Sequence, residues 1–345
     1  MVLKHKDDLR QDALIQSFFE TSNALLRMAD QTTFQNNNET PLQIYTYPVV
    51  PLSPTCGVLH YIEDTIGFGE YITGNINEMV QQGKHSGSKV MFGAHGRYFP
   101  EEMNTLECRT LLDSVPKDKP NEKKNMLLYI YRNFTPAMHY FFLEEGNDNT
   151  KRFVVSSPQD YYQRLQAYTS SVALNSLLGY TIGLGDRHAS NLLLHEKNYK
   201  MILIDFGIAF DQSKALFIPE TIPFRLTRNV MDGFGVRGTA GKFYHYSSHI
   251  LAVLKREKEL CLSILRTLVY DPLTRWSLRA GEQNNNNHKC LPARGDAERV
   301  ISKINEKLDS CNEEQTNQAQ IHKLCQEAQS VPLLSQLFVG WSPWV

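Results

Sequence analysis

The segment 183–207 constrains the fold most, because it places polar catalytic-type residues on both sides of a predicted β-hairpin. Asp186 stands five residues before Asn191. Two apolar runs separated by a polar turn predict a hairpin over 192–204. An Asp-Phe-Gly triplet begins at Asp205, directly after the second run. This order of groups is typical of phosphoryl-transfer enzymes.

The residue types in this segment suit transfer of a phosphoryl group from a nucleotide. Asp186 can orient an attacking hydroxyl and accept its proton, while Asn191 and Asp205 supply hard oxygen ligands for Mg²⁺, or for Mn²⁺ in its place. The alternative is an ordinary turn with a hydrogen-bonded aspartate and a chance Asp-Phe-Gly. The order of both elements around the hairpin favours the catalytic interpretation.

Charge and hydropathy exclude several other classes of protein. The chain has 345 residues with 36 Lys+Arg against 37 Asp+Glu, a net charge of -1, so it has no basic field for direct nucleic acid binding. No apolar run reaches the roughly 18 residues that span a bilayer, so we expect no membrane association. The six cysteines form no CxxC pair and are expected to be reduced thiols of a cytosolic or nuclear protein.

Periodicity predicts the remaining elements. We expect a strand ending near Lys4, an amphipathic helix over 9–29, two short strands within 44–62, and helices over 160–182 and 249–269. The Asn-rich stretch 283–287 predicts a loop, followed by a solvated helix. In the tail, Phe338, Trp341 and Trp344 are spaced by three residues, and we expect them to line one helical face docked on the body.

The triplet Asp186-Arg187-His188 inverts the His-Arg-Asp order of ordinary protein kinases. In this form the chain resembles the phosphoinositide 3-kinase superfamily. The resemblance implies an α+β, bilobal kinase-like fold with a mostly helical C-lobe, and ATP as the cofactor. It also implies that His188 faces the γ-phosphate as a charge stabiliser. The alternative for a lone histidine is a structural role.

The same resemblance extends to the start of the chain. It implies that Lys4 reaches the α- and β-phosphates and that Asp12 holds Lys4 by an ion pair. It places Tyr47, Tyr61 and Ile62 near the interlobe hinge, with Tyr61 against the adenine and the backbone of Ile62 pairing with its edge. Taken singly, the charged residues near the start of the chain could be a solvated surface. The residues near the hinge could equally belong to a buried aromatic strand.

One glycine pattern is excluded by its context. Residues 233–238 match GxGxxG but follow no predicted strand and lie after the catalytic segment, so we expect a turn. The glycine-rich loop of the resembled family would precede Lys4. We therefore expect an incomplete N-lobe and a chain that is a fragment of a larger protein.

The activation segment narrows the resemblance. Pro223, Phe224 and Arg225 are similar to those of the phosphoinositide-3-kinase-related protein kinases, in particular the ataxia-telangiectasia-mutated branch. Residues 334–345 resemble the FATC domain of that family, with Val339 in place of an expected proline. The implied domains are a kinase catalytic domain, a polar regulatory linker and a FATC domain, at 1–277 (partial N-lobe and hinge 1–62, C-lobe 63–277), 278–314 and 315–345.

This resemblance implies a nuclear Ser/Thr protein kinase that modifies Ser or Thr followed by Gln. It implies roles in DNA damage checkpoint signalling and telomere maintenance, a homodimeric full-length protein, and DNA-damage sensor partners bound through amino-terminal regions. Two alternatives stay open. A lipid kinase would need basic side chains in the activation segment, where 208–224 holds only Lys214. A catalytically inactive fragment or scaffold is the other.

Overall fold

The computed structural model describes most of the chain. The described residues are 1–5, 8–33, 41–74, 93–145, 152–153, 155–269, 294–309 and 314–345. The predicted loop at 283–287 and most of the predicted linker lie outside them.

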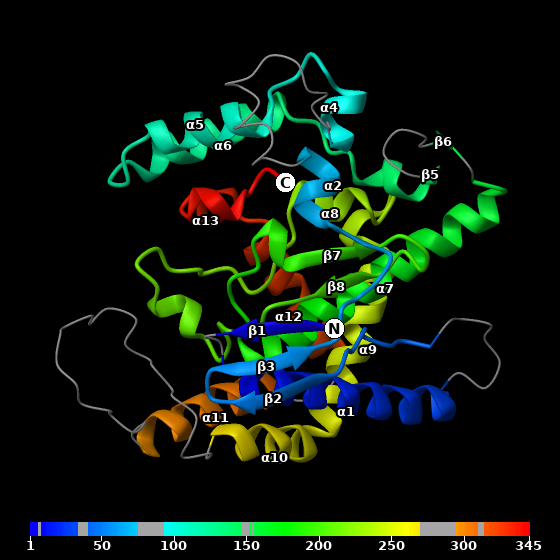
Figure 1. Cartoon of the computed structure of the whole chain (residues 1–345), viewed down its shortest axis with the longest axis vertical. Coiled ribbons are helices and arrows are strands. Elements are labelled where there is room, and N and C mark those ends of the chain that lie inside the picture. Colours follow the sequence, from blue (N-terminus) through cyan, green and yellow to red (C-terminus); the bar gives the residue numbers. More distant parts are fainter. Residues whose placement is uncertain are drawn as a thin grey trace.

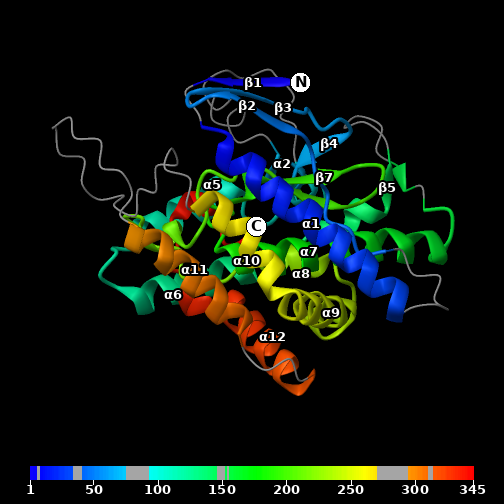
Figure 2. The same cartoon turned by 90° about the horizontal axis from the view of Figure 1, so that it is seen from below.

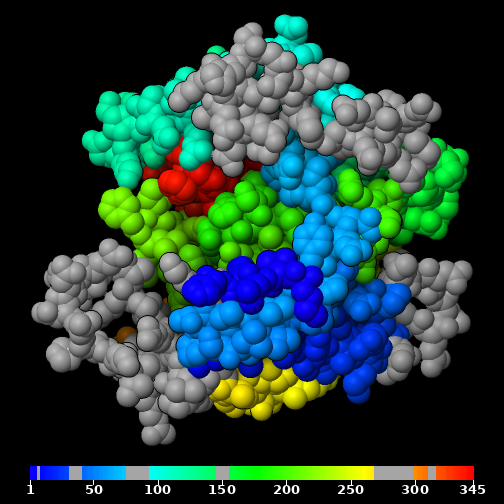
Figure 3. Space-filling view, in the orientation of Figure 1, coloured from blue at the N-terminus to red at the C-terminus, as the bar shows by residue number. Residues whose placement is uncertain are grey.

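The amino-terminal layer is a three-stranded antiparallel sheet packed on a long helix. The strands β1 (Val2–His5), β3 (Cys56–Leu59) and β2 (Val49–Ser53) lie in that spatial order. Helix α1 (Arg10–Thr33) crosses beneath the sheet (Figure 2). The predicted strand at Lys4, the helix and the two short strands are thereby confirmed. Figure 3 shows the outer face of this sheet at the surface of the molecule.

A second antiparallel sheet carries the catalytic segment. It consists of β4 (Thr65–Gly67), β7 (Leu192–His195) and β8 (Met201–Leu203), in that spatial order. Strands β7 and β8 are the predicted hairpin, with Leu192 opposite Leu203. A third, two-stranded sheet pairs β5 (Glu144–Glu145) with β6 (Arg152–Phe153).

Helices make up the rest of the molecule (Figure 1). The central one is α7 (Pro158–Ile182), which is buried along most of its length because its apolar and small residues face neighbours on several sides. The others are α2 (Phe68–Thr73), α4 (Ala94–Tyr98), α5 (Thr105–Ser114), α6 (Pro120–Arg132), α8 (Arg228–Asp232), α9 (Lys242–Arg256), α10 (Lys258–Val269), α11 (Arg294–Leu308), α12 (Glu314–Ala328) and α13 (Val331–Leu334), with 3₁₀ turns η1 (Met138–Phe142), η2 (Ala189–Asn191), η3 (Gln212–Ala215), η4 (Gly238–Ala240) and η5 (Val339–Trp341).

Two helix predictions need correction. The single helix predicted over 249–269 is two helices, α9 and α10, which part at Glu257. Helix α9 packs on α7 and α12, while α10 packs on α1 and α11. The chain changes direction between the two helices because each packs on a different set of neighbours. The helix predicted to be solvated is α11, which instead buries Val300, Ile304 and Leu308. A charged composition hid this narrow apolar stripe.

The tail docks as predicted, but not on one helical face. Trp341 and Trp344 are 2% and 1% exposed, whereas Phe338 is 57% exposed. Helix α13 ends at Leu334 and only the short turn η5 follows, so a spacing of three residues does not keep the three rings on one side. Residues 233–238 form turns after α8, as expected.

The described residues share one hydrophobic core that runs from α1 to the tail. Helix-rich architecture with small, separate sheets is the predicted α+β class. Within the described ranges, no helix has both the length and the apolar character to cross a membrane. Cys56, Cys108, Cys261 and Cys325 are free thiols, while Cys290 and Cys311 lie outside the description.

Candidate active site

The catalytic loop runs from the end of α7 to β7 and holds Asp186 in an unusual backbone conformation. Asp186 has φ +57°, in the left-handed region that few residues other than glycine adopt. Its N–H donates to Glu220 Oε2 at 2.7 Å, and its carbonyl accepts from Asn191 Nδ2 at 2.9 Å. The loop therefore holds the predicted catalytic acid and the predicted metal ligand together.

Asp205 lies two residues beyond the end of β8 and faces the amino-terminal layer. It also has a left-handed backbone, with φ +60°. Lys4 on β1 places its Nζ 3.8 Å from Asp205 Oδ2, and both side chains retain solvent access. Two charged groups that are distant in sequence, predicted separately as phosphate and metal contacts, thus occupy one site.

The donor set fits a metal shared with a nucleotide. Because Asn191 Nδ2 donates to the Asp186 carbonyl, the amide oxygen of Asn191 is left as the oxygen ligand. In the described part of the chain, no group of three or more His, Cys, Asp or Glu residues is placed to hold a metal. Asn191 and Asp205 would hold Mg²⁺ only with further oxygens, and nucleotide phosphates are the usual source.

Arg187 joins the catalytic loop to the Asp-Phe-Gly triplet, a role that the sequence analysis did not assign. Its buried guanidinium donates to the carbonyls of Gly185, Ile204 and Asp205. Burial lowers its pKa, an effect opposed by the nearby carboxylates. Since its donors are occupied by backbone carbonyls, Arg187 sets the spacing between both acidic residues instead of contacting a ligand.

Phe206 anchors the triplet in the core. Its ring meets Phe19 of α1 edge-on and stacks on Tyr47 at 6.4 Å. The start of α1 holds its backbone as well: Phe206 N–H donates to Asp12 Oδ1 at 3.3 Å, and its carbonyl accepts from Gln11 Nε2 at 2.6 Å. Asp12, expected to act on Lys4, therefore also positions the triplet that contains Asp205. The Lys4–Asp12 ion pair stays a prediction.

The hinge residues have different surroundings. Tyr47 is 4% exposed, and burial first, then the charge of Asp12, raises the pKa of its hydroxyl. Tyr61, between β3 and β4, is 58% exposed. The side chain of Ile62 is buried and its carbonyl accepts from Thr65 Oγ1 at 2.9 Å. Of the two predicted hinge rings, Tyr61 is thus the one with exposed area for a flat ligand, while Tyr47 supports Phe206.

His188 lies beside the catalytic acid. Its Nε2 is 3.8 Å from Asp186 Oδ1, and its Nδ1 accepts from Ser190 N–H at 3.2 Å. Burial lowers the pKa of His188, against the opposing effect of Asp186. The imidazole is therefore mainly neutral at neutral pH, with its proton on Nε2. In that form it is a hydrogen-bond donor more than a fixed positive charge.

The last residues of the activation segment contact the carboxyl-terminal tail. Pro223 lines a cavity and Phe224 is buried. Arg225 is also buried, and its two Nη groups donate to backbone oxygens of Arg187, Trp341, Ser342 and Val345 at 2.6–3.2 Å. Burial lowers its pKa to about 9. The tail thus reaches the catalytic loop through one side chain.

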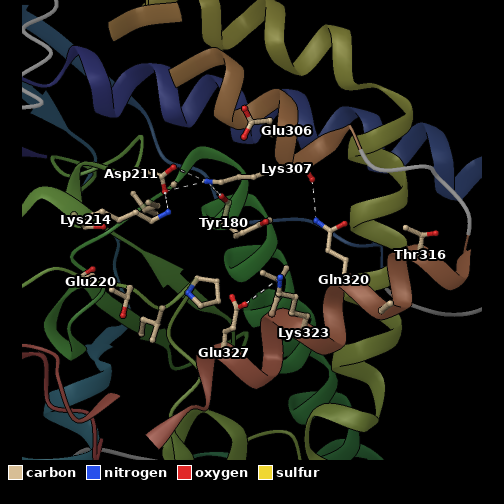
Figure 4. Close-up of a pocket in the computed structure, with 18 residues that line it drawn as sticks. Tyr180, Asp211, Lys214, Glu220, Glu306, Lys307, Thr316, Gln320, Lys323 and Glu327 are labelled. Carbon is tan, nitrogen blue, oxygen red and sulfur yellow. Dashed lines mark hydrogen bonds and ion pairs between the residues drawn. The ribbon is translucent and has the colours of Figure 1, made fainter. Parts of the chain in front are cut away.

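A cavity of about 600 Å³ lies between the activation segment, α7, α11 and α12 (Figure 4). Both signs of charge line it, with Lys307 and Lys214 each close to Asp211. Lys4, Asn191 and Asp205 are not among its lining residues, so it is separate from the predicted nucleotide site. Glu220, which accepts from Asp186 N–H, belongs to both regions.

Comparison with known proteins places these features in a family context. Residues 1–278 match the family model described as phosphatidylinositol 3- and 4-kinase. The chain is 34% identical over 374 residues to the serine-protein kinase ATM of Sus scrofa, covering 100% of this chain and 11% of that protein. It is 35% identical to the serine/threonine-protein kinase ATM of Drosophila melanogaster and 32% identical to tel1 of Schizosaccharomyces pombe. The matches cover 99% and 97% of this chain, and 12% of each relative.

Solved structures agree with this relationship. The structure described as the FAT and kinase domain of CtTel1 superposes with a TM-score of 0.78 at 29% identity, covering 99% of this chain and 21% of that one. The structure described as the Tel1 kinase butterfly symmetric dimer superposes with a TM-score of 0.70 at 28% identity, covering 99% of this chain and 13% of that one. The predicted bilobal kinase fold is therefore confirmed. The chain spans only about a tenth of the length of the curated relatives.

Proposed function

The chain belongs to the phosphatidylinositol 3- and 4-kinase family, and on that premise we propose that it is the catalytic region of an ATP-dependent protein serine/threonine kinase. One observation carries the proposal. Asn191 donates to the Asp186 carbonyl, its own carbonyl accepts from the N–H of Ile204 at 3.2 Å, and Asp205, the next residue, lies 3.8 Å from Lys4. These contacts connect Asp186, Asn191, Asp205 and Lys4, which come from the catalytic loop, the end of the hairpin and β1. Their side chains are those that phosphoryl transfer requires.

Each residue has a distinct part in the reaction. Asp186 orients the substrate hydroxyl and accepts its proton, while Lys4 contacts the nucleotide phosphates. His188 donates from Nε2 to an oxygen of the transferred group. Asn191 and Asp205 would hold Mg²⁺, which neutralises charge on the phosphates when bound. Tyr61 stacks on the adenine, with the backbone at Ile62 pairing with its edge.

A protein substrate is favoured over an inositol lipid. Recognition of an anionic headgroup requires accessible Arg or Lys. In the activation segment, Arg225 is buried with both Nη groups on backbone oxygens, and Lys214 lies 3.1 Å from Asp211. Similarity to relatives that are named protein kinases points the same way. An inactive scaffold is disfavoured because the acid, both metal ligands and the lysine are present.

We extend the proposal to the biological role implied by the resemblance. The substrates are proteins with Ser-Gln or Thr-Gln sites, and the setting is DNA damage checkpoint signalling and telomere maintenance in the nucleus. We also propose that the whole protein is a homodimer recruited by DNA-damage sensor proteins. A related solved structure, described as a complete CtTel1 dimer with C2 symmetry, supports the proposed homodimer.

Substitutions of Asp205 and Asp186 test the proposed chemistry and distinguish the roles of these two acidic residues. Asp205→Ala should lower turnover of a Ser-Gln peptide by a factor equivalent to about 3–4 kcal/mol, because a preorganised charge contact is lost. Asp186→Asn should lower turnover similarly while nucleotide affinity stays near that of the parent, since Asp186 acts on the hydroxyl. Asp113→Ala, on the exposed side of α5, is the matched control and should have no effect on either quantity. Parent-like turnover in Asp205→Ala would contradict the assignment.

Substrate class needs its own assay. We expect radiolabel transfer to a Ser-Gln peptide and none to an inositol lipid offered in parallel. Replacing the Gln by Glu should lower kcat/KM by about tenfold or more, because a site that pairs a neutral amide rejects a charged analogue. Equal rates on Ser-Gln, Ser-Glu and Ser-Pro peptides would leave a protein kinase without the proposed selectivity.

A further inference from the structure

The two residues that begin the Asp-Arg-His triplet are held from both ends by one short stretch of the activation segment. Glu220 Oε2 accepts from the N–H of Asp186 at 2.7 Å. Arg225 Nη1 donates to the carbonyl of Arg187 at 3.2 Å. Glu220 and Arg225 are five residues apart, so residues 220–225 bracket the backbone that carries the catalytic acid.

This backbone needs external support. Asp186 has φ +57°, a conformation that is strained for a residue other than glycine and persists only where its surroundings enforce it. The triplet lies in a loop between α7 and η2, outside any helix or strand ladder. Hydrogen bonds from the activation segment supply constraints that secondary structure does not.

The Arg225 end of this arrangement is built by the tail. Besides the Arg187 carbonyl, the guanidinium reaches the carbonyls of Trp341 and Ser342, both at 2.8 Å, and stacks over the Trp341 ring at 4.1 Å. Among the described residues Arg225 Nε has no hydrogen-bond partner, so burial of the guanidinium depends on the acceptors of its two Nη groups. If the tail left, those acceptors would be lost and Arg225 would turn towards water, releasing the Arg187 carbonyl.

We propose that Glu220 and Arg225 form a clamp on the catalytic loop, and that docking of the tail on Arg225 closes it. Both are positioning residues: they act on Asp186 and His188 through the backbone and do not touch the reacting atoms. The consequence for catalysis rests on the proposed kinase function, whereas the consequence for loop order does not. Through the clamp, a tail far downstream in the sequence would set the catalytic geometry.

The test uses four substitutions in the full chain. Glu220→Ala removes the acceptor, while Glu220→Gln keeps an amide oxygen in the same place. Arg225→Met keeps the length of the stem without donors, while Arg225→Lys keeps the charge and one donor group. Arg228→Met is the matched control, because Arg228 lies three residues further on and donates to the carbonyls of Tyr131 and Phe134 instead of to the catalytic loop.

Hydrogen exchange over residues 184–191 reads the clamp directly. We expect Glu220→Ala and Arg225→Met to speed exchange of this loop by about tenfold or more, since one breaks a partly buried and the other a buried hydrogen bond of the loop backbone. Glu220→Gln and Arg225→Lys should restore part of the protection. Arg228→Met should lower the melting temperature without changing loop exchange. Parent-like loop exchange in both Glu220→Ala and Arg225→Met would overturn the clamp.

Kinetics then link the clamp to chemistry. In both disrupted variants kcat should fall by about tenfold or more while KM for ATP changes little, because the clamp holds the backbone at Asp186, which acts on the substrate hydroxyl and not on the nucleotide. The double variant should lose less than the product of the single losses, since both residues hold one loop. Faster exchange with unchanged kcat would overturn the catalytic part alone. A parent chain without kinase activity would count against the proposed function and leave the exchange result to decide the clamp.

Discussion

At the scale of single residues, the site depends on buried charged groups whose partners are backbone atoms. Arg187 and the Nη groups of Arg225 donate to carbonyl oxygens, and Asp12 accepts from the N–H of Phe206. Through these bonds, charged side chains hold irregular backbone whose polar groups have no partners within a helix or a sheet. Removing one partner would leave the other buried and unsatisfied, which typically costs about 1–3 kcal/mol.

A pH prediction belongs at this scale and concerns His95. The imidazole is 3% exposed and stacks on Phe134 at 3.8 Å, and burial lowers its pKa from 6.5 although Glu102 opposes the shift. The unfolded chain therefore binds more protons than the folded chain as the pH falls below 6.5, so the free energy of unfolding should decrease there. Urea unfolding at about pH 7.5, 6.5 and 5.5 measures this decrease in the free energy of unfolding.

The control for this prediction is His95→Gln. The variant removes one titrating group, so its free energy of unfolding should depend less steeply on pH than that of the parent. A residual slope is expected, because burial also lowers the pKa of His188 and His195. Identical slopes in parent and variant would exclude His95 as a source.

At the scale of elements, α7 ends where the catalytic loop must begin, and Gly183 makes that possible. Its φ is +61°, and a Cβ there would lie 2.5 Å from Asp211 N. Gly183→Ala should therefore cost more than the roughly 1–2 kcal/mol of left-handed strain alone. Thermal unfolding compared with Gly238→Ala checks it, because Gly238 has φ +51° but a Cβ added there would meet no atom within 4 Å. Equal losses would mean that the close approach to Asp211 is absorbed without cost.

The tail is the second element with a measurable contribution. Trp344 is 1% exposed and donates from Nε1 to Thr105 Oγ1 at 3.1 Å. Trp344→Ala should lower the free energy of unfolding by about 3–5 kcal/mol, through the cavity and the lost hydrogen bond. Chemical denaturation provides the measurement.

Phe338→Ala is the matched comparison for the tail. Phe338 is 57% exposed, so its removal should cost about 1 kcal/mol or less. A loss as large as that of Trp344→Ala would show that the exposed ring contributes to packing as much as the buried one.

At the scale of the whole molecule, the core is continuous from α1 through α7 to the tail. We expect one cooperative unfolding transition, because neither the amino-terminal layer nor the tail has a core of its own. In a Trp276→Phe variant, fluorescence reports Trp341 and Trp344, while circular dichroism reports all helices. Coincident midpoints are expected. If the fluorescence midpoint came at a much lower temperature than the midpoint for loss of helix, the tail would unfold as a separate unit.

Sequence alone determined most of the elements and singled out the candidate catalytic residues. Asp186, Asn191 and Asp205 were identifiable because their chemistry depends on spacing around a hairpin of neighbouring residues. The periodicity of α1 and α7 is likewise local. Where an apolar stripe was narrow, as in α11, or where one helix parted into α9 and α10, local pattern failed because the neighbouring surfaces set the outcome.

Only the tertiary structure decided how the site is braced. The contact of Glu220 with Asp186 joins residues 34 positions apart, and that of Arg225 with Val345 joins residues 120 positions apart. No period or spacing marks such pairs, since an isolated Glu or Arg in a loop has the same appearance whether solvated or buried. Burial makes the difference: inside the core each charged group must meet a partner, and the fold alone determines which backbone atom lies within reach.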